Sequence, residues 1–489
     1  MKTNPTQIPT STPTPNRRKT KIIATIGPAS NSPEKLTQLI KAGVNVFRLN
    51  FSHGSHAEHL TILQRIRAAS SELKYPVGIL QDLSGPKIRI SEVAENLDAL
   101  QDGGTVLIKG SKGDKSNNQV IQVEGLDPAS FVKPGQSILL ADGAIVLEAQ
   151  AIQGDAVLCK IIRGAKLRSR IGIAFPESLL NLPAATDKDL IDLQWGIENG
   201  VDFVAISFVQ NADDLLRLRA EITRLKGSVS VISKIERNLA IDNLEEILDL
   251  SDGIMVARGD LGLELPLEKL PRVQKMLIER ANSRGMPVIV ATQMLHSMVN
   301  SIRPTRAEVS DTAVAVMSGA DAVMLSEETA IGSFPVESVE YLHRIALEAE
   351  KGFAFEEYKL RLRNVDKLLV PDAVAYAACA AALKIDASAI IACTETGTSA
   401  RLVAKYRPQQ PLFGVTRNIR TIQRMCLLWG VEPIPVTEAS SHAHELDIAL
   451  ERVQKQWGLA QASLAVITGG QAVGTPGSTS MLEVREMNF

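Results

Sequence analysis

The chain has 489 residues, with 45% apolar residues and 53 Lys and Arg against 55 Asp and Glu. This length exceeds what one hydrophobic core organises, so several domains are expected. The near-neutral charge excludes a global basic field for nucleic acid, and no apolar run is long enough to span a membrane. The four cysteines form no C-x-x-C pair, which favours a reducing, cytoplasmic setting over a disulfide framework or a structural zinc site.

The N-terminal residues 1–18 are rich in Thr, Pro and Asn, and we expect a disordered tail there. After them, short β-branched runs alternate with amphipathic stretches, the pattern of βα units in a parallel sheet. Helices are expected at 34–41 and, with a proline in the first turn, at 304–317. Eight strands are predicted, at 22–26, 44–51, 77–82, 203–207, 229–235, 253–257, 287–291 and 322–325.

Eight parallel strands with intervening helices close most economically as an α/β fold of the (β/α)8 TIM barrel type, with a large open sheet as the alternative. We predict this barrel over residues 19–87 and 171–350. About 120 residues separate its third and fourth strands, far more than a βα loop requires. Within them, residues 88–170 alternate apolar and polar positions between Gly, Pro and Asp turns, which predicts an inserted small antiparallel β domain that caps the barrel.

A third domain is predicted over residues 351–489. Helices are expected there at 373–383 and 399–406, and strands at 387–392, 412–415 and 463–468. This alternation again indicates an α/β unit.

Polar side chains follow almost every predicted barrel strand, where enzymes of this fold place their catalytic groups. Glu236 and Asp260 offer the hard oxygen ligands that Mg²⁺ or Mn²⁺ prefers. Lys234 points to the same side of its strand as Glu236, and such carboxylates beside a lysine and an arginine predict an anionic, phosphorylated substrate. In chain order the strand-end residues are Arg48, Asn50, Ser52, His53, Asp82, Ser207, Lys234, Glu236, Arg258, Gly259, Asp260, Thr292, Gln293, Ser326 and Glu328.

Each of these residues could instead be a structural polar group at a strand end, but charged groups at nearly every strand end favour a site. His53, His56 and His59 recur at helical spacing and could suggest a transition-metal site. We favour a solvated face of a helix that opens with Ser55. The chain contains no Walker A motif, so any phosphate is handled without a P-loop.

Two loops rich in Gly, Thr and Ser lie in the third predicted domain, at 394–401 and 469–480. One such loop indicates little beyond turn chemistry. The first joins a strand to a helix start and offers backbone N–H groups, hydroxyls and a helix dipole to an anion. Two in one α/β unit predict a site for a phosphorylated effector, at Thr394, Glu395, Thr396, Gly397, Thr398 and Ser399.

Nine segments of the chain form a specific set: TIGPAS, GVNVFRLNFSHG, DLSGPKIR, LPAATDKD, VISKIE, MVARGDLGLE, VATQML, RPTRAEVSD and LSEETA. Taken together, they resemble the pyruvate kinase family. The resemblance runs from about residue 18 to 486 and implies a barrel domain, a β-barrel lid, a C-terminal α/β regulatory domain and a homotetramer. It also implies phosphoryl transfer from phosphoenolpyruvate to ADP, the last step of glycolysis, with allosteric control by a phosphorylated metabolite.

The resemblance further implies roles for residues by their motif positions. Lys234 resembles the lysine that touches the transferring phosphoryl group, with Arg48 on the phosphate, and Glu236 and Asp260 resemble the divalent-metal ligands. The implied carboxylate-binding groups are the backbone N–H groups of Gly259 and Asp260 and the Thr292 hydroxyl. Ser326 and Glu328 match a polar relay for proton delivery, for which Thr292 or a water chain are alternatives. The implied nucleotide-binding positions are Asn50, His53, Arg89, Asp142 and Lys188.

Three departures from the common family pattern bear on function. Glu327 stands where many members have Gly, and Glu395 adds negative charge to the effector loop, which leaves a hexose bisphosphate, a monophosphate and a nucleotide monophosphate open as effectors. Members that need K⁺ resemble one another in a threonine and a carboxylate at the positions held here by Leu83 and Lys87. The Lys87 ammonium is expected to replace the ion, so that K⁺ is not required. The other ion positions are Asn50, Ser52 and Asp82, which leave weak K⁺ binding as the alternative.

Two other functions remain as alternatives. A metal-dependent barrel lyase or aldolase acting on an oxo-acid enolate would share the carboxylate pair and the lysine, but the inserted domain and Lys188 argue against it. A non-catalytic sugar-phosphate sensor would use the C-terminal segment alone. That function would tolerate loss of Lys234, Glu236 or Asp260, and all three are present.

Overall fold

The computed structural model describes residues 18–95, 99–141, 143–178, 182–355, 358, 368–436, 442–460, 462–470 and 479–487. The predicted tail therefore lies almost wholly outside the described residues. The chain divides into two compact units. One comprises residues 22–345, and the other joins the first 21 residues to residues 346–489.

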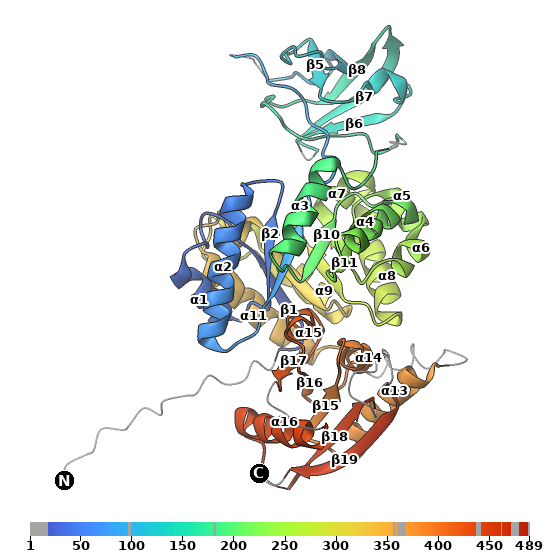
Figure 1. Cartoon of the computed structure of the whole chain (residues 1–489). Helices are drawn as coiled ribbons and strands as arrows, with labels where there is room; N and C mark the ends of the chain where they lie inside the picture. The colour runs from blue at the N-terminus through green and yellow to red at the C-terminus, as the bar shows by residue number, and fades with distance from the viewer. Residues whose placement is uncertain are drawn as a thin grey trace, which may run out of the picture. The chain divides into compact units, whose positions relative to one another are not determined.

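The unit of residues 22–345 is built on a closed barrel of parallel strands (Figure 1). Their order is β1, β14, β13, β12, β11, β10, β3, β2. Most of these strands are buried along their whole length, because helices cover the outside while side chains fill the inside. The predicted TIM barrel is confirmed. Its strands are β1 (Lys21–Thr25), β2 (Val46–Asn50), β3 (Gly78–Asp82), β10 (Phe203–Ile206), β11 (Ser230–Ile235), β12 (Gly253–Ala257), β13 (Val288–Ala291) and β14 (Ala322–Leu325).

Capping residues fix where several barrel helices begin. The Ser32 side chain accepts from the Lys35 N–H at the start of α1, and Thr305 forms a capping box with Glu308 at the start of α9. Pro304 therefore lies before the N-cap residue. The prediction that it lies in the first turn was wrong. The helices of this part are α1 (Pro33–Ala42), α2 (His56–Leu73), α3 (Asp187–Glu198), α4 (Ala212–Arg224), α5 (Asn238–Asp242), α6 (Leu244–Asp249), α7 (Arg258–Glu264), α8 (Leu270–Ser283), α9 (Arg306–Met317), α10 (Glu327–Ala330) and α11 (Pro335–Lys351), with short 3-10 turns η2 (Leu267–Lys269) and η3 (His296–Val299).

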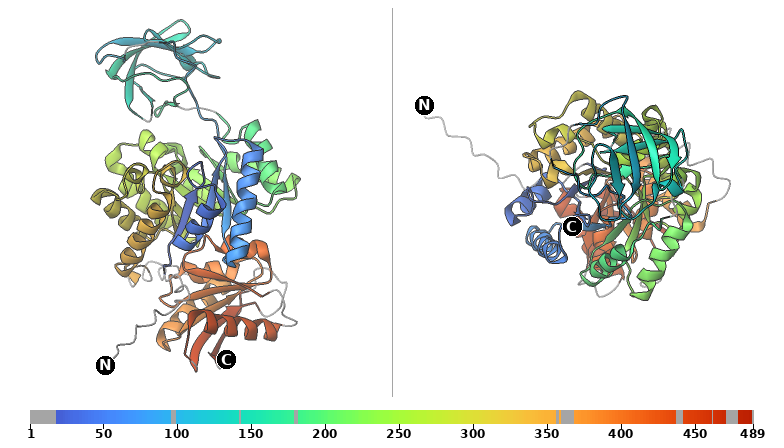
Figure 2. Two further views of the ribbon diagram at one scale, coloured as in Figure 1. Left: turned by 90° about the vertical axis from the view of Figure 1, so that its left-hand side faces the viewer. Right: turned by 90° about the horizontal axis from the view of Figure 1, so that it is seen from above.

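The insertion after β3 forms a six-stranded sheet in the order β5, β4, β8, β7, β6, β9. Its apolar side chains, including Ile108, Ile121 and Leu147, are fully buried in a core of their own, and the strands curl round it (Figure 2). The predicted antiparallel pairing holds except between β4 and β5, which run parallel. The elements are β4 (Thr105–Gly110), β5 (Val120–Val123), η1 (Pro128–Ser130), β6 (Ser137–Leu140), β7 (Ile145–Gln153), β8 (Ala156–Arg163) and β9 (Ile173–Ala174).

The second unit contains a five-stranded sheet in the order β17, β16, β15, β18, β19, parallel except for β19. Alternate residues of β15 enter two different cores: Ile390 packs in one and Ile391 in the other. Apolar clusters therefore cover both faces of the sheet. The elements are α13 (Val370–Lys384), β15 (Ala389–Cys393), α14 (Thr398–Lys405), β16 (Leu412–Thr416), α15 (Ile419–Met425), β17 (Val431–Pro435), α16 (His442–Trp457), β18 (Ser463–Gly469) and β19 (Met481–Met487).

Candidate active site

A row of alternating charges crosses the C-terminal ends of β2, β3 and β11. Asp82 is 1% exposed and lies at its centre. One carboxylate oxygen accepts a 2.6 Å hydrogen bond from Arg48 Nε, and the other lies 3.3 Å from Lys234 Nζ. Lys234 Nζ is also 3.0 Å from Glu236 Oε1. The predicted phosphate-binding cations are thus brought together by a buried carboxylate.

Ser207 connects this row across the end of β10, which lies between β3 and β11. Its hydroxyl accepts a 2.8 Å hydrogen bond from Lys234 Nζ and donates one of 2.8 Å to the Leu83 carbonyl. The lysine side chain is consequently fixed from three directions before any ligand binds.

The charges in this row determine one another's ionisation. Burial alone would raise the pKa of Asp82, but Lys234 and Arg48 outweigh it and lower that pKa. Burial would lower the pKa of Lys234, but Asp82 and Glu236 raise it overall. Lys234 therefore stays an ammonium group at neutral pH.

Glu236 and Asp260 form the candidate metal site. Glu236 is 1% exposed, and one of its oxygens accepts a 2.8 Å hydrogen bond from the Phe208 N–H. Burial raises the pKa of Glu236, Lys234 opposes that shift, and the nearby Asp260 carboxylate adds to it. Both carboxylates line one pocket with Lys87. Two hard oxygen donors whose charges repel each other suit a divalent cation.

Thr292 and Gln293 follow β13 in a strained conformation, with φ of 71° and 53°. A β-branched residue rarely adopts a left-handed backbone, so neighbouring groups must hold it. The Gly259 N–H donates a 2.8 Å hydrogen bond to the Thr292 hydroxyl, and Arg258 Nη2 donates one of 2.7 Å to the Thr292 carbonyl. The Gly259 N–H that the resemblance assigns to a substrate carboxylate is therefore engaged with Thr292 here.

The candidate proton relay at the end of β14 is held mainly by Glu328, which is 1% exposed. Its two oxygens accept backbone hydrogen bonds from Ser326, at 2.7 Å, and Leu295, at 3.0 Å. Glu328 thus ties the β14 end to the segment after β13. The Glu327 side chain is 59% exposed and lies 3.6 Å from His296, so this extra carboxylate faces away from the buried relay.

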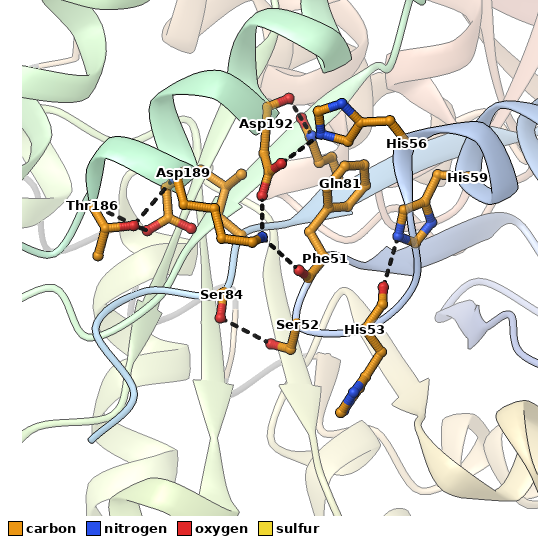
Figure 3. Close-up of polar contacts among 12 residues, drawn as sticks. Phe51, Ser52, His53, His56, His59, Gln81, Ser84, Thr186, Asp189 and Asp192 are labelled. Atoms are coloured by element: carbon orange, nitrogen blue, oxygen red, sulfur yellow. Dashed lines mark hydrogen bonds and ion pairs between the residues drawn. The ribbon is translucent and has the colours of Figure 1, made fainter. Parts of the chain in front are cut away.

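The residues implied for the nucleotide come from four segments of the chain. His53 is exposed in the loop after β2, and Lys188 in the first turn of α3 bonds to the Phe51 carbonyl of that loop at 3.0 Å (Figure 3). Arg89, after β3, donates to the Arg170 carbonyl at 2.9 Å. Asp142 lies outside the described residues.

The histidines after β2 differ from the sequence prediction. Ser55 does cap α2, but His59 is only 6% exposed, stacks on Phe51 with ring centroids 4.1 Å apart and bonds to the His53 carbonyl at 2.9 Å. Burial lowers the pKa of His59. His56 pairs with Asp192 at 2.6 Å. A solvated face was therefore wrong for His59, and no metal-binding group of three or more His, Cys, Asp or Glu occurs among the described residues.

Asp192 was not predicted as a candidate site residue, and His56 was considered only as a metal ligand or a solvated surface residue. The spacing of Lys188 and Asp192, four apart on α3, was an available signal, because such residues are neighbours on a helix surface. No signal in the sequence indicated the pairing of Asp192 with His56, since the two residues are 136 positions apart.

The monovalent-ion positions are only partly assembled. The Asn50 side chain accepts from the Ser52 N–H at 3.2 Å, and Asn50 pairs with Asp82 in the barrel register. Leu83 is 2% exposed, and its apolar side chain offers no ligand. Lys87 is exposed and lines the pocket of the two candidate metal ligands.

The candidate effector loop lies in the second unit. Gly397 has φ of 91°, and its N–H donates a 2.9 Å hydrogen bond to the Thr394 hydroxyl. The Thr396 and Thr398 hydroxyls are 2.9 Å apart, and the Ser399 hydroxyl bonds to that of Thr479 at 2.7 Å. The loop therefore opens α14 with a set of clustered hydroxyls. Most of the second Gly-rich loop, residues 471–478, lies outside the described residues.

Two further observations concern disulfide frameworks and membrane spans, against which the sequence argues. All four cysteines are free and buried. None of the helices in the described ranges has the length and apolarity needed to cross a membrane.

A closed (β/α)8 barrel with buried cations and paired carboxylates at its strand ends defines a class of barrel enzymes that act on anionic substrates. Family models narrow this class, because residues 17–339 match the barrel domain of pyruvate kinase and residues 372–485 match its alpha/beta domain. The chain belongs to the pyruvate kinase family.

Individual relatives agree across nearly the whole chain. It is 43% identical to pyruvate kinase 2 of a Synechocystis species, over 96% of this chain and 79% of that protein. It is 42% identical to the pyruvate kinase of Sporosarcina psychrophila, over 96% and 80%. A crystal structure of a pyruvate kinase from Cryptosporidium parvum superposes with a TM-score of 0.91 at 34% identity, covering 96% of both chains.

The first prediction concerns Asp82. Asp82→Asn should lower the free energy of unfolding by about 3–5 kcal/mol, because it removes the carboxylate that compensates two largely buried cations. Urea unfolding of the barrel, followed by intrinsic fluorescence, measures this. Asp187→Asn is the control, since Asp187 pairs with Arg217 while 96% exposed and should change stability by less than about 1 kcal/mol. A loss below about 1 kcal/mol for Asp82→Asn would contradict the central role of this carboxylate.

Proposed function

We propose that this chain catalyses phosphoryl transfer from phosphoenolpyruvate to ADP, giving pyruvate and ATP, as the last step of glycolysis. The observation that carries the proposal is the row Arg48, Asp82, Lys234 and Glu236 at the strand ends of a pyruvate kinase barrel. In the reaction, an oxygen of the ADP β-phosphate bonds to phosphorus as the enol oxygen leaves. The enolate then takes a proton at its terminal carbon.

Lys234 and Arg48 would supply positive charge to the transferring group. A phosphoryl group in transfer spreads negative charge over its equatorial oxygens, so fixed cations stabilise it without reorganising. The raised pKa of Lys234 keeps that ammonium charged. The bonds to Asp82 and Ser207 hold it in place, which supports positioning as the main catalytic contribution.

Glu236 and Asp260 would hold Mg²⁺ or Mn²⁺. Their oxygen chemistry fits this ion, and each Glu236 oxygen has one partner in the structure and a further lone pair to offer. The ion, when bound, neutralises charge on the phosphoryl and substrate oxygens. A site with two protein carboxylates leaves coordination positions for those oxygens, as Mg²⁺ sites commonly do.

Thr292, with the backbone of Gly259 and Asp260 in the first turn of α7, would orient the carboxylate of phosphoenolpyruvate, and the Gly259 N–H would exchange its bond to the Thr292 hydroxyl for one to the substrate. For proton delivery we propose the region of Ser326 and Glu328. Both Glu328 oxygens are taken by backbone N–H groups, which favours a positioning role for Glu328. The hydroxyls of Ser326 and Thr292 are then the proposed proton carriers, and the Thr292 hydroxyl, which donates to the Ala291 carbonyl in the structure, would have to turn to the substrate.

The nucleotide would be bound by Asn50, His53, Arg89, Asp142 and Lys188. We propose that these positions are distributed over a barrel domain of residues 19–87 and 171–350 and a lid of residues 88–170, with a regulatory domain at 351–489. A homotetramer in the cytoplasm is the expected setting. A barrel lyase or aldolase would need neither the lid nor Lys188, and a sensor would not need the charge row.

A second prediction tests the function directly. The chain should convert phosphoenolpyruvate and ADP to pyruvate in the presence of Mg²⁺, as followed by coupled pyruvate reduction. Lys234→Met should lower kcat a hundredfold or more, about 3 kcal/mol, because it removes charge that the transition state uses most. Lys41→Met, on the exposed end of α1, is the control. A Lys234 variant within tenfold of the unmodified chain would refute its role, and absence of activity in the unmodified chain would refute the function.

A third prediction concerns the monovalent ion. The Lys87 ammonium, in the pocket of Glu236 and Asp260, would supply the charge that K⁺ supplies elsewhere. Activity in tetramethylammonium salts with Mg²⁺ should rise less than twofold when K⁺ is added at matched ionic strength, since screening alone alters charged encounters. Lys87→Met should introduce stimulation by K⁺. A tenfold rise in the unmodified chain would restore an ordinary K⁺ site.

A fourth prediction concerns allosteric control through the loop of Thr394 to Ser399. Sugar phosphates or AMP should shift the phosphoenolpyruvate saturation curve. The coupling free energy between the two sites should be about 1–3 kcal/mol, and the substrate should change the affinity for the effector by the same factor. The double change Thr398→Ala and Ser399→Ala should abolish the shift, because it removes two of the clustered hydroxyls. Ser463→Ala at the start of β18 is the control. An unchanged response in the double variant would contradict this site.

A further inference from the structure

The Lys188 ammonium is held by two groups of the protein. Lys188 Nζ lies 2.6 Å from Asp192 Oδ2 and 3.0 Å from the Phe51 carbonyl, while the side chain as a whole is 61% exposed. Figure 3 labels the two acceptors, Asp192 on α3 and Phe51 in the loop after β2. An ammonium group has three N–H donors. Two are used internally, and the third is available on the exposed side.

Asp192 is a buried carboxylate, 4% exposed, with a different partner on each oxygen. Oδ1 is 2.6 Å from His56 Nε2, and the backbone carbonyl of Asp192 accepts a 2.7 Å hydrogen bond from Gln81 in β3. A buried carboxylate is costly unless both of its oxygens have hydrogen-bonding or charged partners. Lys188 is the partner of one oxygen and His56 is the partner of the other. Asp192 thereby connects α3 to α2 and to the barrel.

His56 is fixed by packing as well as by Asp192. Its ring lies 5.6 Å from that of Trp195 in α3 and 6.1 Å from that of Phe51. It remains 42% exposed, so its position depends on these contacts and not on deep burial. With His56 on Oδ1, Asp192 offers a single oxygen to Lys188.

We propose that Asp192 and His56 are positioning residues that present the third N–H of Lys188 to the phosphates of a nucleoside diphosphate. Without His56, both carboxylate oxygens could turn to the ammonium, which would occupy the donor that a phosphate needs. A lysine that is already held in one conformation also loses less side-chain entropy when its ligand binds. The chain His56, Asp192 and Lys188 therefore sets nucleotide affinity.

This inference rests on the proposed role of Lys188 at the nucleotide, and it predicts a split between kinetic constants. His56→Leu should raise KM for ADP about five- to tenfold, the value of one ordinary hydrogen bond, because the ammonium keeps its charge and loses one available donor. KM for phosphoenolpyruvate and kcat at saturating ADP should change much less. His56→Gln should recover most of the loss, because its amide can donate to Asp192 Oδ1. Asp192→Asn is less informative, since it alters a buried charge and folding with it.

A double-mutant cycle separates the inference from the proposed function. Lys188→Met combined with His56→Leu should bind ADP no more weakly than Lys188→Met alone, because His56 acts through Lys188. Calorimetric titration with ADP and Mg²⁺ gives the same comparison without turnover. Gln194→Leu on the exposed face of α3 is the matched control, and thermal unfolding checks each variant's fold.

The outcomes are distinguishable. If Lys188→Met leaves ADP binding unchanged, the nucleotide role of Lys188 is wrong, and the positioning inference falls with it. If Lys188→Met weakens ADP binding but His56→Leu does not, the positioning inference alone is overturned. Equal increases in both KM values, or additive effects in the cycle, would show a general structural role for His56 and would also overturn it.

Discussion

The buried carboxylate of Asp82 is the constraint on which the rest of the site depends. Arg48 and Lys234 stand on strands that are not neighbours, and like charges this close would repel each other without an anion between them. Asp82 offsets that repulsion, and the two cations in turn lower the pKa of its carboxyl group. The parallel order β2, β3, β10, β11 brings these strand ends to one edge of the sheet, so the charge row depends on the strand order of the barrel.

The barrel was predictable because its strands are continuous apolar runs, a pattern that parallel sheets covered on both sides impose. The second unit was less predictable from the sequence. β17 contains Pro433 and Pro435, which argue against a strand, yet it lies at the sheet edge where a missing N–H is tolerated. β19 carries three charged residues, Glu483, Arg485 and Glu486, and only its last residue is buried, so its sequence resembles a loop as much as a strand. Both segments are strands because they pair with a neighbouring strand in the folded sheet.

The positions of the candidate site residues at the barrel strand ends were also predictable, because these ends converge and their polar residues can be taken from the sequence. Their partners were not. The Gly259 N–H bonds to Thr292, Glu328 binds two backbone groups, and His56 reaches Asp192 on another helix. Each is a contact between segments far apart in the sequence, which periodicity cannot specify. The sequence therefore predicts which groups are present, and only the structure shows which are already occupied.

That occupancy favours a site organised before substrate arrives. Two successive left-handed residues, Thr292 and Gln293, cost on the order of 1–3 kcal/mol each, and the buried Arg258 offsets this through bonds to the Thr292 carbonyl and to Asp311. Lys234 and Lys188 are likewise held by carboxylates and carbonyls. A reaction whose catalysis lies mainly in placing charges gains most from such arrangements, because groups already fixed need no reorganisation in the transition state.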